Sequence, residues 1–234
     1  MMLRSALLSI ATWACSLQAI WAQPVPVPAE QINSWAVFDR YRDDNAALKP
    51  DLSRVVFLGD SITENWAKEP FISGNPHYVG RGVSGQTALQ MLVRFRADVL
   101  ALKPRLVHIM AGTNDLAANH GYESDEAIEG AIQSMTELAL ANHIRVLLAS
   151  IPPTTDFPWR PGLQPAPRIR RINQWLESFA KRARVAYVDY GRVLATDEGA
   201  MKEGLSEDGV HPNSQGYAAM QPVARATIES AMHQ

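Results

Sequence analysis

The chain has 234 residues, of which 47% are apolar and 20% charged, and this globular composition excludes a disordered, collagenous or coiled-coil protein. With 22 basic and 24 acidic residues the formal charge is −2, so no basic excess exists that would attract a nucleic-acid backbone. The length is that of one α/β domain with a sizeable core.

Residues 1–22 are predicted to be a secretory signal peptide. A single cation, Arg4, precedes an uncharged, largely apolar stretch that ends in Ala22. Because this stretch is almost long enough to span a bilayer, an uncleaved membrane anchor is the alternative. Cleavage after Ala22 would also remove Cys15, the only cysteine, and with it any disulfide, thiolate metal site or cysteine nucleophile. We expect a periplasmic or secreted mature chain with no membrane span.

Residues 23–50 are predicted to form a linker and lead-in segment, because the prolines at its start exclude helix. The remainder, residues 51–234, alternates short apolar runs with helical patterns. The runs are rich in β-branched residues without polar alternation, which is typical of strands buried on both faces of a parallel sheet. They occupy residues 55–58, 106–110, 145–149 and 185–188, with a weaker candidate at 78–79. This alternation predicts one doubly wound α/β sandwich.

Helices are predicted where apolar residues recur at helical spacing. The helix after Thr87 has Leu89, Leu92 and Val93 as its apolar stripe. The stripes of three further helices lie within residues 128–139, 169–179 and 217–228.

The connection at residues 151–167 is unusually long and contains six prolines together with Phe157 and Trp159. A long loop in a compact domain is usually functional or disordered. Because this loop follows a strand at the edge where open α/β sheets bind ligands, we expect it to form a pocket wall. A plain surface excursion is the alternative.

Ser61 is the first candidate for chemistry, because Gly59-Asp60-Ser61 joins the first strand to a helix that can begin at Ile62. This turn lies at the edge of the sheet where sites form, and the free N–H groups of a helix start can stabilise a developing oxyanion. Ordinary helix capping by Asp60 or Ser61 explains the same tripeptide.

Two later turns could supply further donors. Residues 80–85 match the letters of the dinucleotide fingerprint G-x-G-x-x-G, but that fingerprint belongs to the first βα unit and needs an acidic residue about 20 positions on. We therefore reject a dinucleotide cofactor, and the glycine-rich turn can instead expose a backbone N–H to a small anion. Asn114, after the third strand, can aim its amide at the same spot, with an Asx turn as the alternative.

Asp208 and His211 lie three residues apart in a loop punctuated by Gly209 and Pro212. At this spacing the carboxylate can accept the imidazole Nδ1–H, which leaves Nε2 free to take a proton from a serine. A metal site is the weaker interpretation of this pair, because the chain has no H-E-x-x-H and the mature chain would have no cysteine.

Together these segments resemble, in the correct order, the sequence blocks of the SGNH (GDSL) hydrolase family, and the match spans nearly the whole mature chain. The blocks are residues 57–61, 82–85, 112–115 and 208–212. The residues in these blocks resemble those of the bacterial relatives of platelet-activating-factor acetylhydrolase more than those of the lysophospholipase/thioesterase branch.

The resemblance implies a flavodoxin-like three-layer α/β/α sandwich with a five-stranded, mainly parallel sheet, and a serine esterase mechanism that needs no cofactor and no metal. It assigns Ser61 as the nucleophile, His211 as the general base and Asp208 as the acid that orients the base.

The resemblance also implies three oxyanion donors, which are the Ser61 N–H, the Gly85 N–H and the Asn114 side chain, with Gly82 as the alternative to Gly85. Trp66 and Trp159 could flank the substrate, although ordinary aromatic packing explains them equally well.

The expected substrate is a small-molecule or carbohydrate ester with a short acyl group, such as an acetylated sugar or a small lipid-like acetate. A lysophospholipase or thioesterase with a longer acyl pocket is one alternative, and a non-catalytic glycan-binding module is another. Nucleic acid is not expected as a partner, and the sequence leaves the oligomeric state open.

Overall fold

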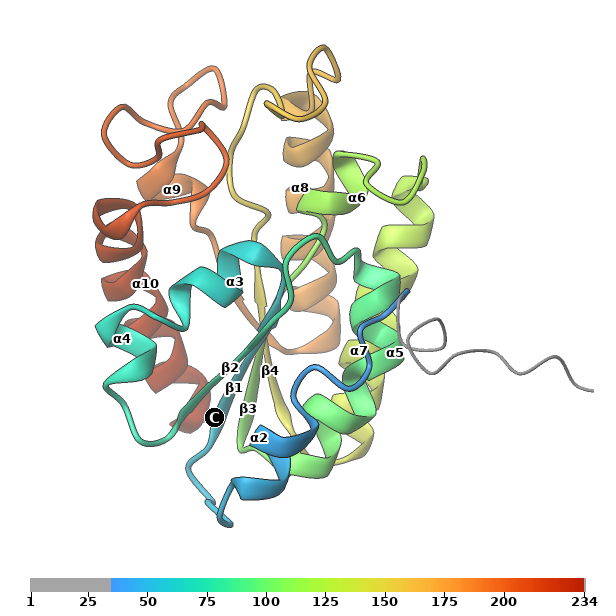
Figure 1. Cartoon of the computed structure of the whole chain (residues 1–234), viewed down its shortest axis with the longest axis vertical. Helices are drawn as coiled ribbons and strands as arrows, with labels where there is room; N and C mark the ends of the chain where they lie inside the picture. The colour runs from blue at the N-terminus through green and yellow to red at the C-terminus, as the bar shows by residue number, and fades with distance from the viewer. Residues whose placement is uncertain (1–34, 234) are drawn as a thin grey trace, which may run out of the picture.

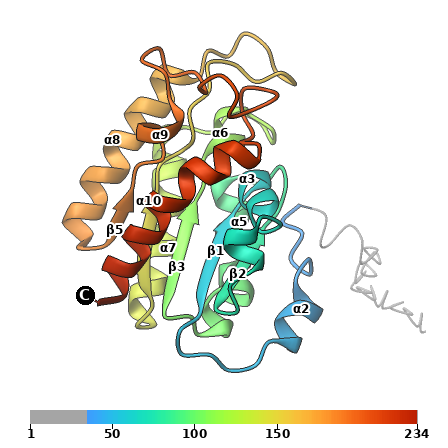
Figure 2. The same ribbon diagram turned by 90° about the vertical axis from the view of Figure 1, so that its left-hand side faces the viewer.

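The computed structural model describes residues 35–233, so the predicted signal peptide and the first part of the linker lie outside the described residues. Within that range five parallel strands form one sheet in the order β2-β1-β3-β4-β5, with helices on both of its faces (Figures 1 and 2). The predicted α/β/α sandwich with a five-stranded sheet is confirmed.

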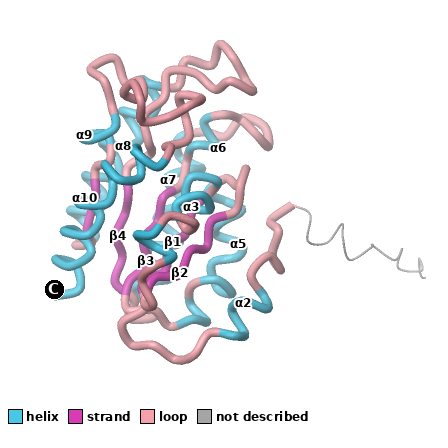
Figure 3. Tube along the Cα trace, turned by 60° about the vertical axis from the view of Figure 1, so that its left-hand side comes forward, coloured by secondary structure: helices cyan, strands magenta, loops and turns pink. Residues whose placement is uncertain are grey.

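The strands are β1 (Val55–Gly59), β2 (Tyr78–Gly82), β3 (Leu106–Met110), β4 (Arg145–Ala149) and β5 (Ala186–Val188). Every residue of β1 and β3 is buried, because both strands lie inside the sheet and helices cover both faces. Parallel register places the carboxyl ends of neighbouring strands at one edge. The long loops of the molecule gather at that edge (Figure 3).

The helices are α2 (Arg42–Ala47), α3 (Ser61–Trp66), α4 (Pro70–Ser73), α5 (Ala88–Asp98), α6 (Thr113–Leu116), α7 (Asp125–Ala141), α8 (Ala166–Ala183), α9 (Gly191–Leu194) and α10 (Ser214–His233), with a 3₁₀ turn at Leu100–Leu102. Within residues 35–233, no helix combines the length and the apolarity needed to cross a bilayer.

Each face of the sheet has its own apolar core. Helices α5, α7 and α8 pack on one face through mainly aliphatic side chains. Helices α3, α4 and α10 pack on the other, where the core is aromatic. Trp66 belongs to this second core, since it contacts Phe57 edge-to-face at 5.7 Å between ring centroids and stacks on Tyr217 at 5.9 Å. Trp66 is 0% exposed, so the prediction that it flanks the substrate is wrong.

Helix α5 turns a different side to the core from the one that the sequence predicted. The expected stripe is partly exposed, with Val93 47% accessible, whereas Arg94 and Asp98 are buried. These two side chains form an ion pair at 3.0 Å inside the protein. Because paired charges can be buried, polarity does not mark the outer face of this helix.

The lead-in segment packs against α5 and β2 through hydrogen bonds. The Gln86 Nε2 amide donates to the Ala36 carbonyl at 2.5 Å, and the Tyr41 hydroxyl donates to the Gly82 carbonyl. Asn45 donates from Nδ2 to Asp98 Oδ1 at 2.8 Å. The described part of the segment is therefore joined to the loop that follows β2.

Candidate active site

Ser61 lies at the carboxyl end of β1 and is the first residue of α3. The Asp60 side chain caps this helix by accepting from the Ile62 N–H at 2.9 Å. The Ser61 N–H is in the first turn, where a helical amide has no intrahelical acceptor, and it remains available to another one. The ends of β2 and β3 lie on either side of β1, so their loops border Ser61.

The structure brings Ser61, His211 and Asp208 into one hydrogen-bonded line. Ser61 Oγ is 2.9 Å from His211 Nε2, although 150 residues separate them, and His211 Nδ1 is 2.7 Å from Asp208 Oδ2. A carboxylate can only accept, so it holds the imidazole proton on Nδ1 and leaves the Nε2 lone pair toward the hydroxyl. This arrangement can remove a proton from Ser61.

Residues 206–211, which we call the His211 loop, organise themselves locally. Asp208 Oδ1 accepts from the Val210 N–H at 2.9 Å and the His211 N–H at 2.8 Å, and also from the Ser206 hydroxyl. Partial burial acts to raise the pKa of Asp208, but the hydrogen bonds from His211 and Val210 outweigh it and lower the pKa to about 2. The carboxylate is therefore ionised at neutral pH.

Gly85 faces the space beside Ser61. It is the third residue of a β-turn closed by the Gln86 N–H donating to the Val83 carbonyl at 3.3 Å, and its φ of +81° is one that glycine adopts without strain. A Cβ added to Gly85 would meet nothing within 4 Å, whereas one on Gly82 would lie 2.1 Å from the Glu64 nitrogen. Gly85 is thus the glycine that borders the open space, and Gly82 is enclosed.

The Gly85 turn is fastened to α3 by a carboxylate. Glu64 Oε2 accepts from both the Ser84 N–H, at 2.8 Å, and the Ser84 hydroxyl, at 2.5 Å. Its other oxygen accepts from Arg40 of the lead-in segment at 3.0 Å. Burial acts to raise the pKa of Glu64, but these hydrogen bonds outweigh it and lower the pKa below its ordinary value.

Asn114 completes this side of the site from the first turn of α6. Its Nδ2 donates to the Gln86 carbonyl at 3.1 Å and lies 3.3 Å from Asp60 Oδ2. Its Oδ1 accepts from Asn119 Nδ2 at 2.6 Å. We call Gly85, Asn114 and Asn119 the amide wall.

Asp60 lies behind the amide wall and differs electrostatically from Asp208. It is fully buried, and burial raises its pKa to about 6 in spite of the hydrogen bond from the Ile62 N–H and the proximity of His211. The site thus contains two aspartates whose pKa values are shifted in opposite directions.

An open groove of about 430 Å³ lies beside Ser61 and His211. Its lining consists of Ser61, Asn65, Ser84, Gly85, Asn114, Asn119, Trp159 and His211. Trp159, from the proline-rich loop, is 42% exposed and its ring lies 5.9 Å from the His211 ring. The loop therefore forms a wall of the groove through Trp159.

The geometry of α3 explains why one predicted residue is absent from the groove and another was overlooked. An α-helix turns about 100° per residue, so position 65 projects within about 40° of Ser61 and position 66 about 140° away. Asn65 lines the groove and Trp66 enters the core. The i, i+4 spacing is a signal that could have found Asn65. No regular spacing points to Asn119, and the contacts of Glu64 with Ser84 and Arg40 join separate segments.

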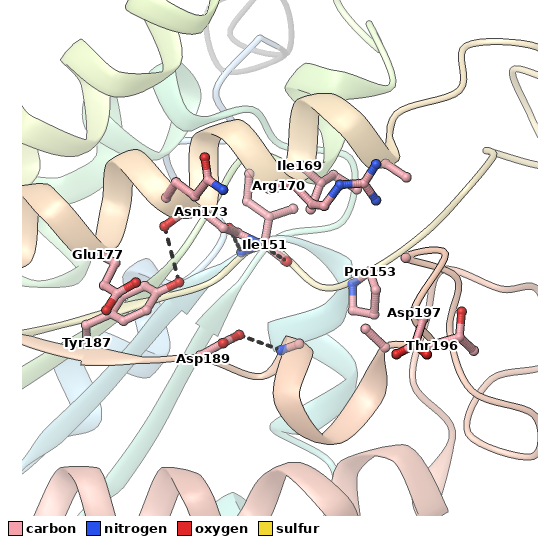
Figure 4. Close-up of a pocket in the computed structure, with 15 residues that line it drawn as sticks. Ile151, Pro153, Ile169, Arg170, Asn173, Glu177, Tyr187, Asp189, Thr196 and Asp197 are labelled. Carbon is pink, nitrogen blue, oxygen red and sulfur yellow. Dashed lines mark hydrogen bonds between the residues drawn. The ribbon is translucent and has the colours of Figure 1, made fainter.

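A second cavity, of about 250 Å³, lies between α8, β5 and α9 and contains none of the three aligned residues (Figure 4). Ile151 and Pro153 of the proline-rich loop border it. Asn173 brackets Ile151, accepting from its N–H at 2.8 Å and donating to its carbonyl at 3.0 Å. The base of the loop is thereby fixed to α8. Across the described range 35–233, no cluster of three or more His, Cys, Asp or Glu side chains could hold a metal ion.

Comparison with known proteins places this geometry in a family. The profile of the GDSL-like Lipase/Acylhydrolase family matches residues 57–219. A GDSL-like lipase from Bacteroides thetaiotaomicron is 41% identical, and the alignment covers 84% of this chain and 99% of that one with a TM-score of 0.80. A Streptococcus pneumoniae protein described as a platelet activating factor candidate is 18% identical over 85% of this chain and 97% of its own, with a TM-score of 0.72, and shares the fold.

Among curated proteins, N-acylneuraminate cytidylyltransferase of Streptococcus agalactiae serotype V is 30% identical over 171 residues. The match covers 73% of this chain and 38% of that protein, so the chain spans little more than a third of its relative's length. The family profile covers most of the chain, including both the serine turn and the His211 loop. The chain belongs to the GDSL-like lipase/acylhydrolase family of hydrolases.

Proposed function

We propose that the protein is a serine esterase that hydrolyses carboxylic esters with short acyl groups through an acyl-enzyme. The observation that carries the proposal is the line from Ser61 Oγ to His211 Nε2 at 2.9 Å and from His211 Nδ1 to Asp208 at 2.7 Å. A serine hydroxyl is a weak nucleophile unless a base takes its proton as it attacks, and this line supplies that base.

In the proposed reaction Ser61 Oγ attacks the ester carbonyl carbon while its proton passes to His211 Nε2. The carbonyl oxygen becomes an oxyanion that can accept hydrogen bonds from the Ser61 N–H, the Gly85 N–H and Asn114 Nδ2. His211 then protonates the leaving alcohol as its bond to carbon breaks. A water molecule, deprotonated by the same imidazole, attacks the acyl-enzyme, and the proton returns to Ser61 Oγ as the carboxylic acid leaves.

The lining of the groove supports a short acyl group and a polar alcohol portion. Apart from Ser61, His211 and Gly85, it is made of Asn65, Ser84, Asn114, Asn119 and Trp159. Amide and hydroxyl groups suit a sugar or another polyol, and an exposed indole offers a flat apolar face. A long acyl chain would need apolar walls to cover it. We therefore favour acetyl esters of carbohydrates or of small lipid-like molecules.

The proposal is tested by replacing the nucleophile. Ser61→Ala should lower kcat for p-nitrophenyl acetate by at least about 10³-fold, because the proton donor and attacking atom are lost together. Ser134→Ala, at a half-buried serine on α7, is the matched control and should keep wild-type turnover. A fluorophosphonate should label the wild type and not Ser61→Ala. Turnover of Ser61→Ala within tenfold of the wild type would refute the mechanism.

The acyl preference is tested separately with p-nitrophenyl esters of two to twelve carbons. We expect kcat/KM to be highest at two to four carbons, because the groove is open and, within residues 35–233, its lining has no aliphatic side chain to cover a longer acyl group. A maximum at eight or more carbons would support the longer-chain lysophospholipase or thioesterase alternative.

We also propose that the protein is exported, on the basis of the signal-like pattern in residues 1–22. Expression of the full chain in a bacterium should release a product whose mass corresponds to cleavage after Ala22, in the periplasm or medium. An intact chain retained in the membrane fraction would support the anchor alternative.

A further inference from the structure

Three side chains that come from separate segments form a chain of hydrogen bonds through the amide wall. Trp159 Nε1 donates to Asn119 Oδ1 at 2.9 Å, and Asn119 Nδ2 donates to Asn114 Oδ1 at 2.6 Å. Asn114 Nδ2 then donates to the Gln86 carbonyl at 3.1 Å. The chain runs from the proline-rich loop to the turn that contains Gly85.

The two ends of this series of hydrogen bonds determine which end of each amide is the donor. An indole N–H can only donate, so the atom of Asn119 that faces it must be the carbonyl oxygen. The NH₂ of Asn119 then faces Asn114, and it needs the side-chain oxygen of Asn114 as its acceptor. At the far end a backbone carbonyl can only accept, which also requires the Asn114 nitrogen there. All these hydrogen bonds are satisfied only when the Asn114 NH₂ faces the Gln86 carbonyl and Asp60 Oδ2 and its oxygen faces Asn119.

Asn119 is held firmly enough to act in this way. Its backbone N–H donates to the Asn114 carbonyl at 3.1 Å, so main chain and side chain both contact the same residue. Asn114 is 3% exposed, so protein groups are the main hydrogen-bond partners of its amide. An amide is nearly symmetric in shape, so hydrogen-bond partners and not packing decide which of its ends is the donor.

We propose that Asn119 is a positioning residue that fixes the Asn114 amide with its NH₂ toward the oxyanion, and that the Trp159 N–H sets the direction of this relay. The inference rests on the proposed esterase function, in which Asn114 is an oxyanion donor. It gives the proline-rich loop a role in turnover in addition to forming the groove wall. If the Asn114 amide were reversed, its carbonyl oxygen would repel the oxyanion that it now stabilises.

Asn119→Asp is the most direct test, because it keeps size and shape but removes the donor. The carboxylate still accepts from the indole, while its second oxygen faces Asn114 Oδ1 and favours the reversed amide. We expect kcat for p-nitrophenyl acetate to fall by about 100-fold, as when one oxyanion donor is removed, with KM within about threefold. Asn142→Asp, at the exposed end of α7, is the matched control and should keep wild-type kcat.

A double-mutant cycle separates positioning from other effects. If Asn119 acts only through Asn114, then Asn119→Asp should lower kcat by less than about twofold in an Asn114→Ala background. A direct effect of the new charge on the oxyanion, or general damage to the groove, would lower kcat in that background as well. An effect of tenfold or more in the double variant would overturn the proposal.

Trp159→Phe tests the start of the relay and does not depend on Asn119→Asp folding. It keeps an aromatic ring but removes the N–H, so kcat should fall by about three- to tenfold in the wild type and by less than twofold in Asn119→Ala. Trp175→Phe on α8 is the control. Equal effects of Trp159→Phe in both backgrounds would show that the indole acts independently of Asn119.

The failure of this inference is distinguishable from failure of the proposed function. If Ser61→Ala abolishes turnover but Asn119→Asp stays within twofold of the wild type, the relay is wrong and the esterase proposal stands. If Ser61→Ala retains turnover, the esterase proposal itself fails.

Discussion

The His211 loop and the amide wall meet at the same groove but are stabilised in different ways. In the loop, the described hydrogen bonds to Asp208 all come from residues within three positions of it. The amide wall is held by contacts between separate segments. Glu64 binds Ser84 beside Gly85, Asn119 binds Asn114, and the lead-in segment binds Gln86. His211 and Asp208 are thus a local unit, whereas the groups of the amide wall depend on tertiary packing. Substitutions far from Ser61 should therefore disturb the wall more than the loop.

Asp208 and Asp60 differ in the same way as the His211 loop and the amide wall. Asp208 is partly exposed and its pKa is lowered to about 2 because it accepts several hydrogen bonds, mainly from the His211 side chain and backbone. Asp60 is fully buried and its pKa is raised to about 6. One carboxylate is stabilised in its charged form by its own loop, and the other is penalised by the interior that surrounds it.

The largest effect is expected where the local unit is broken. Asp208→Asn should lower kcat/KM for p-nitrophenyl acetate by about 10³- to 10⁴-fold, because an amide in this place no longer holds the proton on Nδ1. Asp197→Asn, in the exposed loop after α9, should leave kcat/KM unchanged. A loss of less than tenfold in Asp208→Asn would mean that His211 is oriented without Asp208.

An intermediate effect, on stability, is expected from Asp60. A carboxyl whose pKa is raised by folding binds its proton more tightly in the native state, so its contribution is present below pH 4 and is lost as pH rises through about 6. Between pH 4.5 and 7 this costs the wild type about 2 kcal/mol. Asp60→Asn cannot ionise at this position. Its stability can differ from that of the wild type by a constant amount, but it does not have this pH-dependent loss.

The difference in Tm between Asp60→Asn and the wild type should therefore shift in favour of the variant by about 4–8 °C between pH 4.5 and 7, measured by calorimetry. Every other carboxyl group is retained in both proteins, so the comparison isolates the ionisation of Asp60. A difference that stays constant with pH would show that Asp60 does not titrate in this range.

The smallest effect is expected from loosening the wall at its edge. Glu64→Gln weakens the charged hydrogen bonds to Ser84 and should lower kcat by about fivefold, because the Gly85 N–H is less well positioned. Glu137→Gln, exposed on α7, is the matched control. A steady-state assay that finds kcat unchanged in Glu64→Gln would show that the turn is held without this carboxylate.

Local sequence features predicted the parts of the molecule that are locally determined. Unalternating apolar runs predicted β1 and β3 because strands covered on both faces need no polar side. The three-residue spacing between Asp208 and His211 predicted their contact because both residues lie in one short loop. Helix α5 was predicted with the wrong face inward, because its buried face carries Arg94 and Asp98, whose pairing exists only in the folded protein.

The rest of the site depends on contacts that no single segment encodes. Asn119 meets Asn114 through an irregular turn and meets Trp159 from a loop 40 residues away. Trp66 was assigned to the groove from its nearness to Ser61 in the chain, although helical geometry turns it toward the core. In both cases proximity in space and proximity in sequence differ.

The position of the lead-in segment has a practical meaning for anyone shortening this protein. The family profile begins at residue 57, yet Ala36, Arg40 and Tyr41 already form hydrogen bonds with Gln86, Glu64 and Gly82, around the turn that contains Gly85. A shortened protein that begins at residue 57 would lose the hydrogen bonds that these residues make with Gln86, Glu64 and Gly82. A fragment that keeps these contacts therefore has to begin upstream of Ala36, before the region that the family profile matches.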